Sequence, residues 1–180
     1  MSSKKEIWTR AHEVVRKYGG GARDPFRIAD AKGYMIEDLY MRADRTKGFA
    51  QIAAGRTLLH INRNLSEEMQ RMTCAHELGH ATLHRRILKQ GLLCEYDLFM
   101  AKTRLEYEAN LFAAYLLMDE KEVVRCVREG CSLEWIAGHM DVHPNYAALI
   151  IRSLYDRGKL PKEMKLPDMP DCQFLGFIDD

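Results

Sequence analysis

The chain has 180 residues, of which 47% are hydrophobic and 29% are charged, a composition typical of globular proteins that excludes long disorder. Its 27 lysines and arginines nearly balance its 26 aspartates and glutamates, so no overall charge favours nucleic acid or an anionic membrane as a partner. No apolar run is long enough for a signal peptide or a membrane span. We therefore expect a cytoplasmic protein with a single domain, residues 1–180.

The first quarter of the chain predicts two helices. Ser3 and Glu6 form a capping box in front of an apolar pattern with helical spacing, and the glycines at 19–21 end this first helix. Asp24 followed by Pro25 predicts the start of a short second helix.

Three strand-length runs follow, at 34–41, 47–54 and 56–62. Gly55-Arg56 predicts a tight turn between the last two. We expect an α+β fold in which a small three-stranded antiparallel sheet buries one face against a helix.

The helix that covers this sheet is expected to begin at Asn64, with Glu67 reaching back to complete the cap. Residues 85–104 mix basic, apolar and glycine residues, which predicts irregular structure. An alanine-rich helix resumes at 105–117. The remaining expected elements are a helix at 119–129, a C-terminal helix pair within 131–158 and a proline-rich tail at 160–180.

Five cysteines form no C-x-x-C pair, and their odd number favours reduced thiols in the core over a disulfide framework. They are Cys74, Cys94, Cys126, Cys131 and Cys172.

The segment "CAHELGHATLH", residues 74–84, carries the strongest chemical signal. On a helix, His76 and His80 point to the same side, where they can share one tetrahedral ion. Glu77 is turned by about 100° from His76 and lies beside that ion, where a carboxylate can take a proton from water. This is the H-E-x-x-H motif, which predicts zinc bound by the histidines and a catalytic glutamate.

His84 shares the helix face but is not expected to bind the same ion, because it lies about 12 Å along the axis from His76. It is expected to orient its neighbours by hydrogen bonding, to help end the helix, or simply to pack.

A catalytic zinc of this kind needs a third ligand and an open position for water. Glu108 lies at the edge of the apolar stripe of the 105–117 helix, where a metal ion would neutralise the buried carboxylate. Glu106 lies among polar neighbours and is interpreted as a solvated charge. We therefore expect Glu108 to be the third ligand.

At these residues the sequence resembles the ImmA/IrrE family of zinc metallopeptidases. The resemblance rests on "RMTCAHELGHATLH", "EANLFAAYLLM", "LLHINRNL" with Asn62, and "DPFRIADAKGYMI", and it covers residues 24–120. It implies a gluzincin-like catalytic core over this range, with ligands His76, His80 and Glu108 and with Glu77 catalytic. Asp119 stands where the family usually has proline.

The resemblance also implies a partner. Members are often encoded beside helix-turn-helix repressors in prophages and mobile elements, and they relieve repression by cutting or inactivating that repressor. The resulting prediction is a zinc-dependent regulatory endopeptidase. Candidate groups for stabilising the oxyanion are Tyr96, Tyr107, Tyr115, His139 and His143, and Asn110 is a candidate acceptor for a zinc-bound imidazole.

Two other interpretations remain open. The helix pair within 131–158 could be a helix-turn-helix, although Arg152 and Arg157 offer little charge for DNA, and we do not expect direct nucleic-acid binding. Alternatively, the protein could inactivate a partner without cutting it. A purely structural zinc is not expected, since only three protein ligands are found. The 160–180 tail is expected either to dock on the surface or to occupy the cleft as an autoinhibitory strand.

Overall fold

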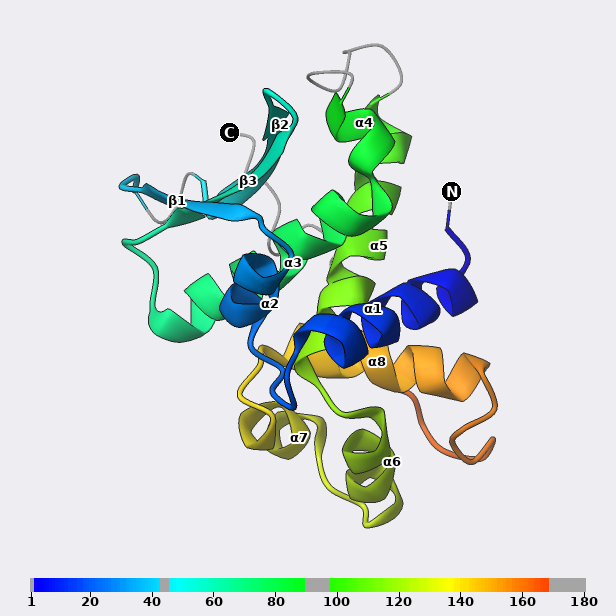
Figure 1. The fold of residues 1–180 in the computed structure, drawn as a ribbon. Helices are drawn as coiled ribbons and strands as arrows, with labels where there is room; N and C mark the ends of the chain where they lie inside the picture. The colour runs from blue at the N-terminus through cyan, green and yellow to red at the C-terminus, as the bar shows by residue number, and fades with distance from the viewer. Residues whose placement is uncertain (1, 43–45, 90–97, 169–180) are drawn as a thin grey trace.

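The protein is α+β, with a three-stranded sheet at one side of a body of helices (Figure 1). The computed structural model describes residues 2–42, 46–89 and 98–168. In these ranges no helix combines the length and apolar character that a membrane span requires. The elements are α1 Lys4–Tyr18, α2 Pro25–Ala31, β1 Met35–Leu39, β2 Gly48–Ala53, β3 Arg56–Asn62, α3 Glu67–Leu83, α4 Arg85–Lys89, α5 Leu98–Leu117, α6 Glu120–Arg128, α7 Leu133–His139 and α8 Pro144–Asp156.

The first two helices begin where their capping residues predicted. The Ser3 hydroxyl accepts the Glu6 N–H at 3.2 Å, and the Glu6 carboxylate accepts the Ser3 N–H at 2.6 Å, so the capping box is complete. Asp24 likewise accepts the Phe26 N–H at 2.9 Å, with Pro25 in the first turn of α2. Local capping chemistry therefore fixes both helix starts.

The sheet packs one face on α3 as expected, with Leu59 and Ile61 of β3 fully buried. Strands β2 and β3 are antiparallel, and their turn is formed by Ala54 and Gly55, one residue earlier than predicted. Both residues have positive φ, 48° and 78°, as a two-residue hairpin turn requires.

Strand β1 is the exception to the predicted antiparallel sheet. It pairs in parallel with the other edge of β3, which gives the strand order β1-β3-β2. The prediction was wrong here because alternation of apolar residues shows which face of a strand is buried, but not the direction of its neighbour.

Helix α3 begins after Ser66, not after Asn64 as the sequence suggested. The Ser66 hydroxyl accepts the Met69 N–H at 3.2 Å. The side-chain amide of Asn64 instead donates to the Met41 carbonyl at 2.8 Å, and buried Asn62 donates to the same carbonyl at 3.1 Å. Both amides therefore hold the loop after β1 against the end of β3.

The segment 85–104 is more helical than predicted. Helix α4 follows α3 closely, and α5 begins at Leu98 rather than at Leu105. The prediction of irregular structure is wrong for these parts, because the leucine, methionine, alanine, lysine and arginine in the early turns of α5 are strong helix formers. Residues 90–97 lie outside the described residues, as do residues 169–180 of the predicted tail.

The thiols that the structure describes are reduced. Cys74 and Cys126 are buried in the core, which confirms the prediction for these two, whereas Cys131 is half-buried. Cys94 and Cys172 lie outside the described residues.

Helix α8 is part of the core. Eight of its 13 residues are buried, whereas a DNA-recognition helix must expose one face to the major groove. Arg152 lies 3.8 Å from Asp156, and Arg157 lies 3.0 Å from Glu120, so both arginines face acids. The structure therefore favours a helix pair that closes the core over one that reads DNA.

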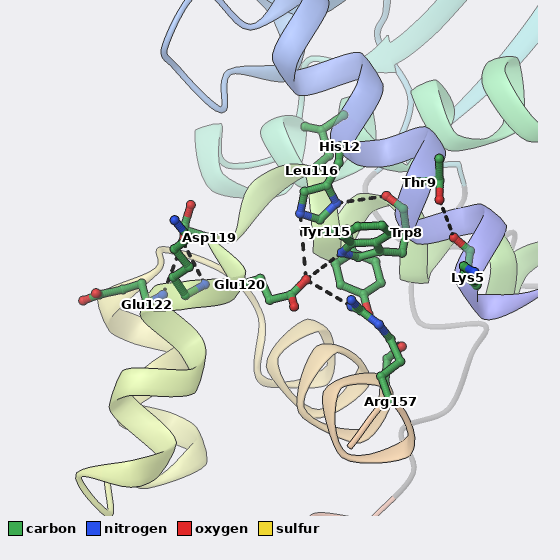
Figure 2. Close-up of polar contacts among 12 residues, drawn as sticks. Lys5, Trp8, Thr9, His12, Tyr115, Leu116, Asp119, Glu120, Glu122 and Arg157 are labelled. Atoms are coloured by element: carbon green, nitrogen blue, oxygen red, sulfur yellow. Dashed lines mark hydrogen bonds and ion pairs between the residues drawn. The ribbon is translucent and has the colours of Figure 1, made fainter. Parts of the chain in front are cut away.

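One carboxylate joins the helices at the two ends of the described chain. A single oxygen of Glu120, at the start of α6, accepts the Trp8 indole N–H at 2.6 Å and an Arg157 N–H at 3.0 Å (Figure 2). A ring nitrogen of His12 lies 3.9 Å from the same oxygen. The Arg157 guanidinium also lies over the Trp8 ring, 4.5 Å from its centroid. These contacts hold α1 and α8 against α6.

Helices α3 and α5 cross closely at Gly79. A Cβ atom at this position would lie 3.0 Å from the Ala109 carbonyl oxygen and 3.3 Å from the Phe112 ring. Only glycine allows this approach without displacing the backbone of α5. The crossing brings the acidic residues of α5 beside the histidines of α3.

The substitution Gly79→Ala is expected to lower the free energy of unfolding by about 1 kcal/mol, because overpacking against backbone costs about 1–3 kcal/mol and exceeds the gain in helix propensity. Gly138 is a matched control, since it lies in α7 with no atom within 4 Å of an added Cβ. Gly138→Ala is expected to stabilise by up to about 1 kcal/mol. Urea unfolding checks both, and equal effects of the two substitutions would contradict the close crossing.

Candidate metal centre

Helix α3 presents His76 and His80 on one face, one turn apart. Their Nε2 atoms lie 3.0 Å from each other, and the ring centroids are 4.7 Å apart. His76 is buried and the His80 side chain is 14% exposed. The spacing of four residues predicted this convergence, because such residues lie above one another on a helix.

The acid that reaches both rings is Glu106, not Glu108. Its carboxylate oxygens lie 3.1 Å from His76 Nε2 and 3.4 Å from His80 Nε2. The three side chains place their ligand atoms within 4.8 Å of one another. Glu106 was interpreted as a solvated charge, but its side chain is only 12% exposed.

Glu108 is buried, as predicted, but other groups neutralise it. Its carboxylate lies 3.3 Å from His84 Nε2 and 3.2 Å from Arg104 Nε, and it also accepts the Ser2 backbone N–H. The expectation that Glu108 lies with the two converging rings is therefore wrong. Helical periodicity correctly predicted that Glu108 is buried. It did not identify the groups that compensate the charge of this carboxylate, which are His84 and Arg104.

The ring of His76 is held by a hydrogen bond on the side away from Glu106. Its Nδ1 lies 2.8 Å from the side-chain oxygen of Asn110, which confirms the predicted acceptor. The same oxygen accepts the hydroxyl of Tyr146 at 3.4 Å. Tyr146 is fully buried on α8, and it was not among the predicted site residues. The sequence signal for its burial was its position on the apolar face of the helix that begins at Pro144.

The ring of His80 is held in a similar way by His84. The Nδ1 atoms of His80 and His84 lie 3.0 Å apart. The other ring nitrogen of His84, Nε2, lies 3.3 Å from a carboxylate oxygen of Glu108. His84 also forms the C-cap of α3. The expectation that it orients a neighbour and helps to end the helix is confirmed.

A cation fits the space between these groups. The hydrogen-bond network assigns a proton to Nδ1 of both His76 and His80, because each Nδ1 faces an acceptor. Both Nε2 lone pairs then point toward Glu106, whose Oε2 is buried without a hydrogen-bond partner. Three converging acceptors repel one another unless a positive charge lies among them.

The pKa values show the same preference for positive charge. Burial lowers the pKa of His76, but the contacts with Glu106 outweigh burial and leave the pKa above its ordinary value. Burial raises the pKa of Glu106, but the two imidazoles outweigh this and hold the pKa far below its usual range. The site therefore stabilises a cation.

Glu77 lies beside this cluster on the side of strand β2. A Cβ atom on Gly48 of β2 would lie 3.6 Å from Glu77 Cγ, and the Ala50 backbone forms a hydrogen bond with the carboxylate. Burial raises the pKa of Glu77, although His76 and His80 oppose the rise. A carboxylate with a raised pKa is suited to accept a proton and release it again.

The candidate oxyanion groups lie at different places. Tyr115 donates to Ser153, and His139 contacts Glu122 on α6, so these two are engaged elsewhere. His143 forms the N-cap of α8, Tyr107 contacts Lys4, and Tyr96 lies outside the described residues.

The substitution Asn110→Ala is expected to weaken zinc binding about 10–100-fold, because His76 loses the acceptor that fixes its ring and tautomer. Chelator competition measures this affinity. Tyr115→Phe is the control, since it removes another buried hydrogen bond of α5 and should leave zinc affinity unchanged. An equal loss in both variants would mean that general loosening of the core, rather than ring orientation, is responsible.

Comparison with known proteins gives a consistent result. Residues 29–140 match the IrrE N-terminal-like domain, peptidase family M78. The chain is 37% identical over 144 residues to Metallopeptidase ImmA of Bacillus subtilis (strain 168). The aligned region covers 77% of this chain and 79% of that protein. It is 35% identical over 77 residues to Uncharacterized immunity region protein 2 of Bacillus phage phi105, which covers 41% of this chain and 45% of that protein.

Proposed function

This chain belongs to the ImmA/IrrE family of metallopeptidases, and we propose that it is a zinc-dependent endopeptidase that cuts a helix-turn-helix repressor. The observation that carries this proposal is the convergence of His76, His80 and Glu106 beside Glu77. The similarity to a phage immunity-region protein supports a phage or mobile-element setting, in which a repressor is a suitable substrate.

We assign the zinc ligands to His76, His80 and Glu106, because two imidazoles and one carboxylate suit zinc and leave a position open. When bound, zinc supplies Lewis-acid polarisation of water and of the scissile carbonyl. Glu77 accepts the proton of the attacking water and then delivers it to the leaving amine. Asn110 and His84 hold the two rings in orientation throughout.

Strand β2 offers a place for the substrate backbone. It forms one edge of the sheet and lies against α3 at Glu77. An extended peptide segment can add to such an edge through main-chain hydrogen bonds. We propose that the repressor presents an extended segment along β2, with its scissile bond beside Glu77.

The test uses the repressor encoded beside the gene, incubated with the zinc-loaded protein and analysed by mass spectrometry. The wild type is expected to produce defined fragments. Glu77→Gln, at equal zinc content, is expected to produce none on the same time scale. If the repressor stays intact with the wild type while its operator DNA is released, the protein inactivates its partner without cutting it, and the hydrolytic proposal fails.

A further inference from the structure

A second group of potential metal ligands lies on α6 and α7. Ligand atoms of Glu122, Cys126 and His139 lie within 4.8 Å of one another, and His139 Nε2 is 3.1 Å from a Glu122 oxygen. Figure 1 shows α6 and α7 at the opposite end of the molecule from the sheet, away from α4 and the end of α3. None of these three residues takes part in the centre on α3.

Helices α6 and α7 bring the three side chains together. Glu122 and Cys126 are four residues apart on α6 and therefore lie above one another on one face. His139 comes from α7, where its ring stacks on Trp135 with centroids 4.7 Å apart and an interplanar angle of 18°. The thiol donor is buried, whereas the side chains of His139 and Glu122 are 42% and 31% exposed. An ion can therefore enter from solvent and meet the thiol at the bottom of the cluster.

The charges nearby allow a dication to bind. Arg125 donates to both oxygens of Glu122, from Nε at 3.0 Å and from a terminal NH2 group, and it also lies 3.2 Å and 3.3 Å from the two oxygens of Glu129. The guanidinium therefore keeps a partner when Glu122 turns to an ion. A carboxylate and a thiolate together neutralise a dication, and the neutral imidazole adds a third donor.

We propose that Glu122, Cys126 and His139 form a second metal site for a zinc-like divalent cation, which joins α6 to α7. Thiolate and imidazole ligands select zinc or cobalt over magnesium and calcium. The Cys126 thiol loses its proton to solvent when its sulfur binds the metal, and the imidazole binds in its neutral form. The site does not depend on the proposed peptidase function.

Cobalt substitution tests this site separately from the centre on α3. A thiolate bound to Co²⁺ gives a near-ultraviolet charge-transfer band, whereas the His76, His80 and Glu106 centre contains no thiol. The apo wild type titrated with Co²⁺ is expected to show the band, and the double variant His76→Ala/His80→Ala should keep it. Cys126→Ser should abolish it. Cys131→Ser is the matched control, because this neighbouring cysteine lies outside the ligand group and its loss should leave the band unchanged.

A second variant is needed because Cys126 is buried, and Cys126→Ser could lose the band through misfolding rather than through loss of a ligand. His139→Ala alters a half-exposed side chain and is expected to weaken at least tenfold the Co²⁺ binding that gives the charge-transfer band. Circular dichroism verifies that both variants remain folded. The absence of the band in the wild type, its persistence in Cys126→Ser, or its loss in Cys131→Ser would each overturn the proposal.

Discussion

Glu77→Gln is expected to reduce repressor cleavage by about 10²–10⁴-fold, because glutamine cannot accept the proton of the attacking water. The side chain keeps its size, and its contacts with strand β2 remain possible. Zinc affinity should change little, since Glu77 is not among the three side chains that converge. Single-turnover cleavage at saturating enzyme measures the effect on the chemical step.

The control for Glu77→Gln is zinc content, measured on the same preparation by elemental analysis. Glu13→Gln provides a second control, because Glu13 is an exposed acid on α1. It should cleave at the wild-type rate. If Glu77→Gln has full zinc content and cleaves the repressor at the wild-type rate, Glu77 is not the general base.

The second large effect concerns the two acids of α5. Glu106→Ala is expected to abolish stoichiometric zinc binding under conditions in which the wild type is saturated, because only two imidazoles remain. Glu108→Gln retains the shape of its side chain, and its effect passes through His84 to His80, so we expect a loss of about 10–100-fold in affinity. Isothermal titration with zinc compares the two variants with the wild type.

The informative result is which of the two substitutions, Glu106→Ala or Glu108→Gln, lowers zinc affinity more. If Glu108→Gln lost zinc completely while Glu106→Ala retained it, the assignment of ligands would be reversed. Unfolding curves of both apo proteins are required, because Glu108 is buried against His84 and Arg104, and its substitution also affects stability.

The convergence of His76 and His80 could be predicted from the sequence because it depends only on local helical geometry. Spacing of four residues determines that both rings share one face, whatever else packs nearby. The same reasoning gave the helix caps at Ser3 and Asp24, where a short polar side chain meets the next backbone N–H groups.

The third converging residue could not be found in this way. Whether Glu106 or Glu108 reaches the rings depends on how α5 is rotated about its axis and where it crosses α3, and the contact between Gly79 and Ala109 sets both. The burial of Glu108 was predicted correctly, but Arg104 and His84, rather than a metal, compensate its charge. Burial of an acid thus indicates that it has a partner without identifying the partner.

Two further features depend on contacts between segments that are distant in the sequence. The parallel pairing of β1 with β3 is set by the path of the chain around the sheet, not by the composition of β1. Tyr146 reaches Asn110 only because α8 packs in the core. The periodicity of α8 indicates that Tyr146 is buried, but the periodicity of one segment does not identify the partner in either contact.

A crystal structure of the zinc-loaded protein, with anomalous diffraction at the zinc edge, would locate the metal and its ligands directly. We expect a zinc ion about 2.0–2.2 Å from Nε2 of His76, Nε2 of His80 and the Glu106 carboxylate, with Glu77 beside the ion but not bound to it. Glu108 should remain on His84. A zinc ion bound by Glu108, with Glu106 turned toward solvent, would show that the proposed ligand assignment is wrong.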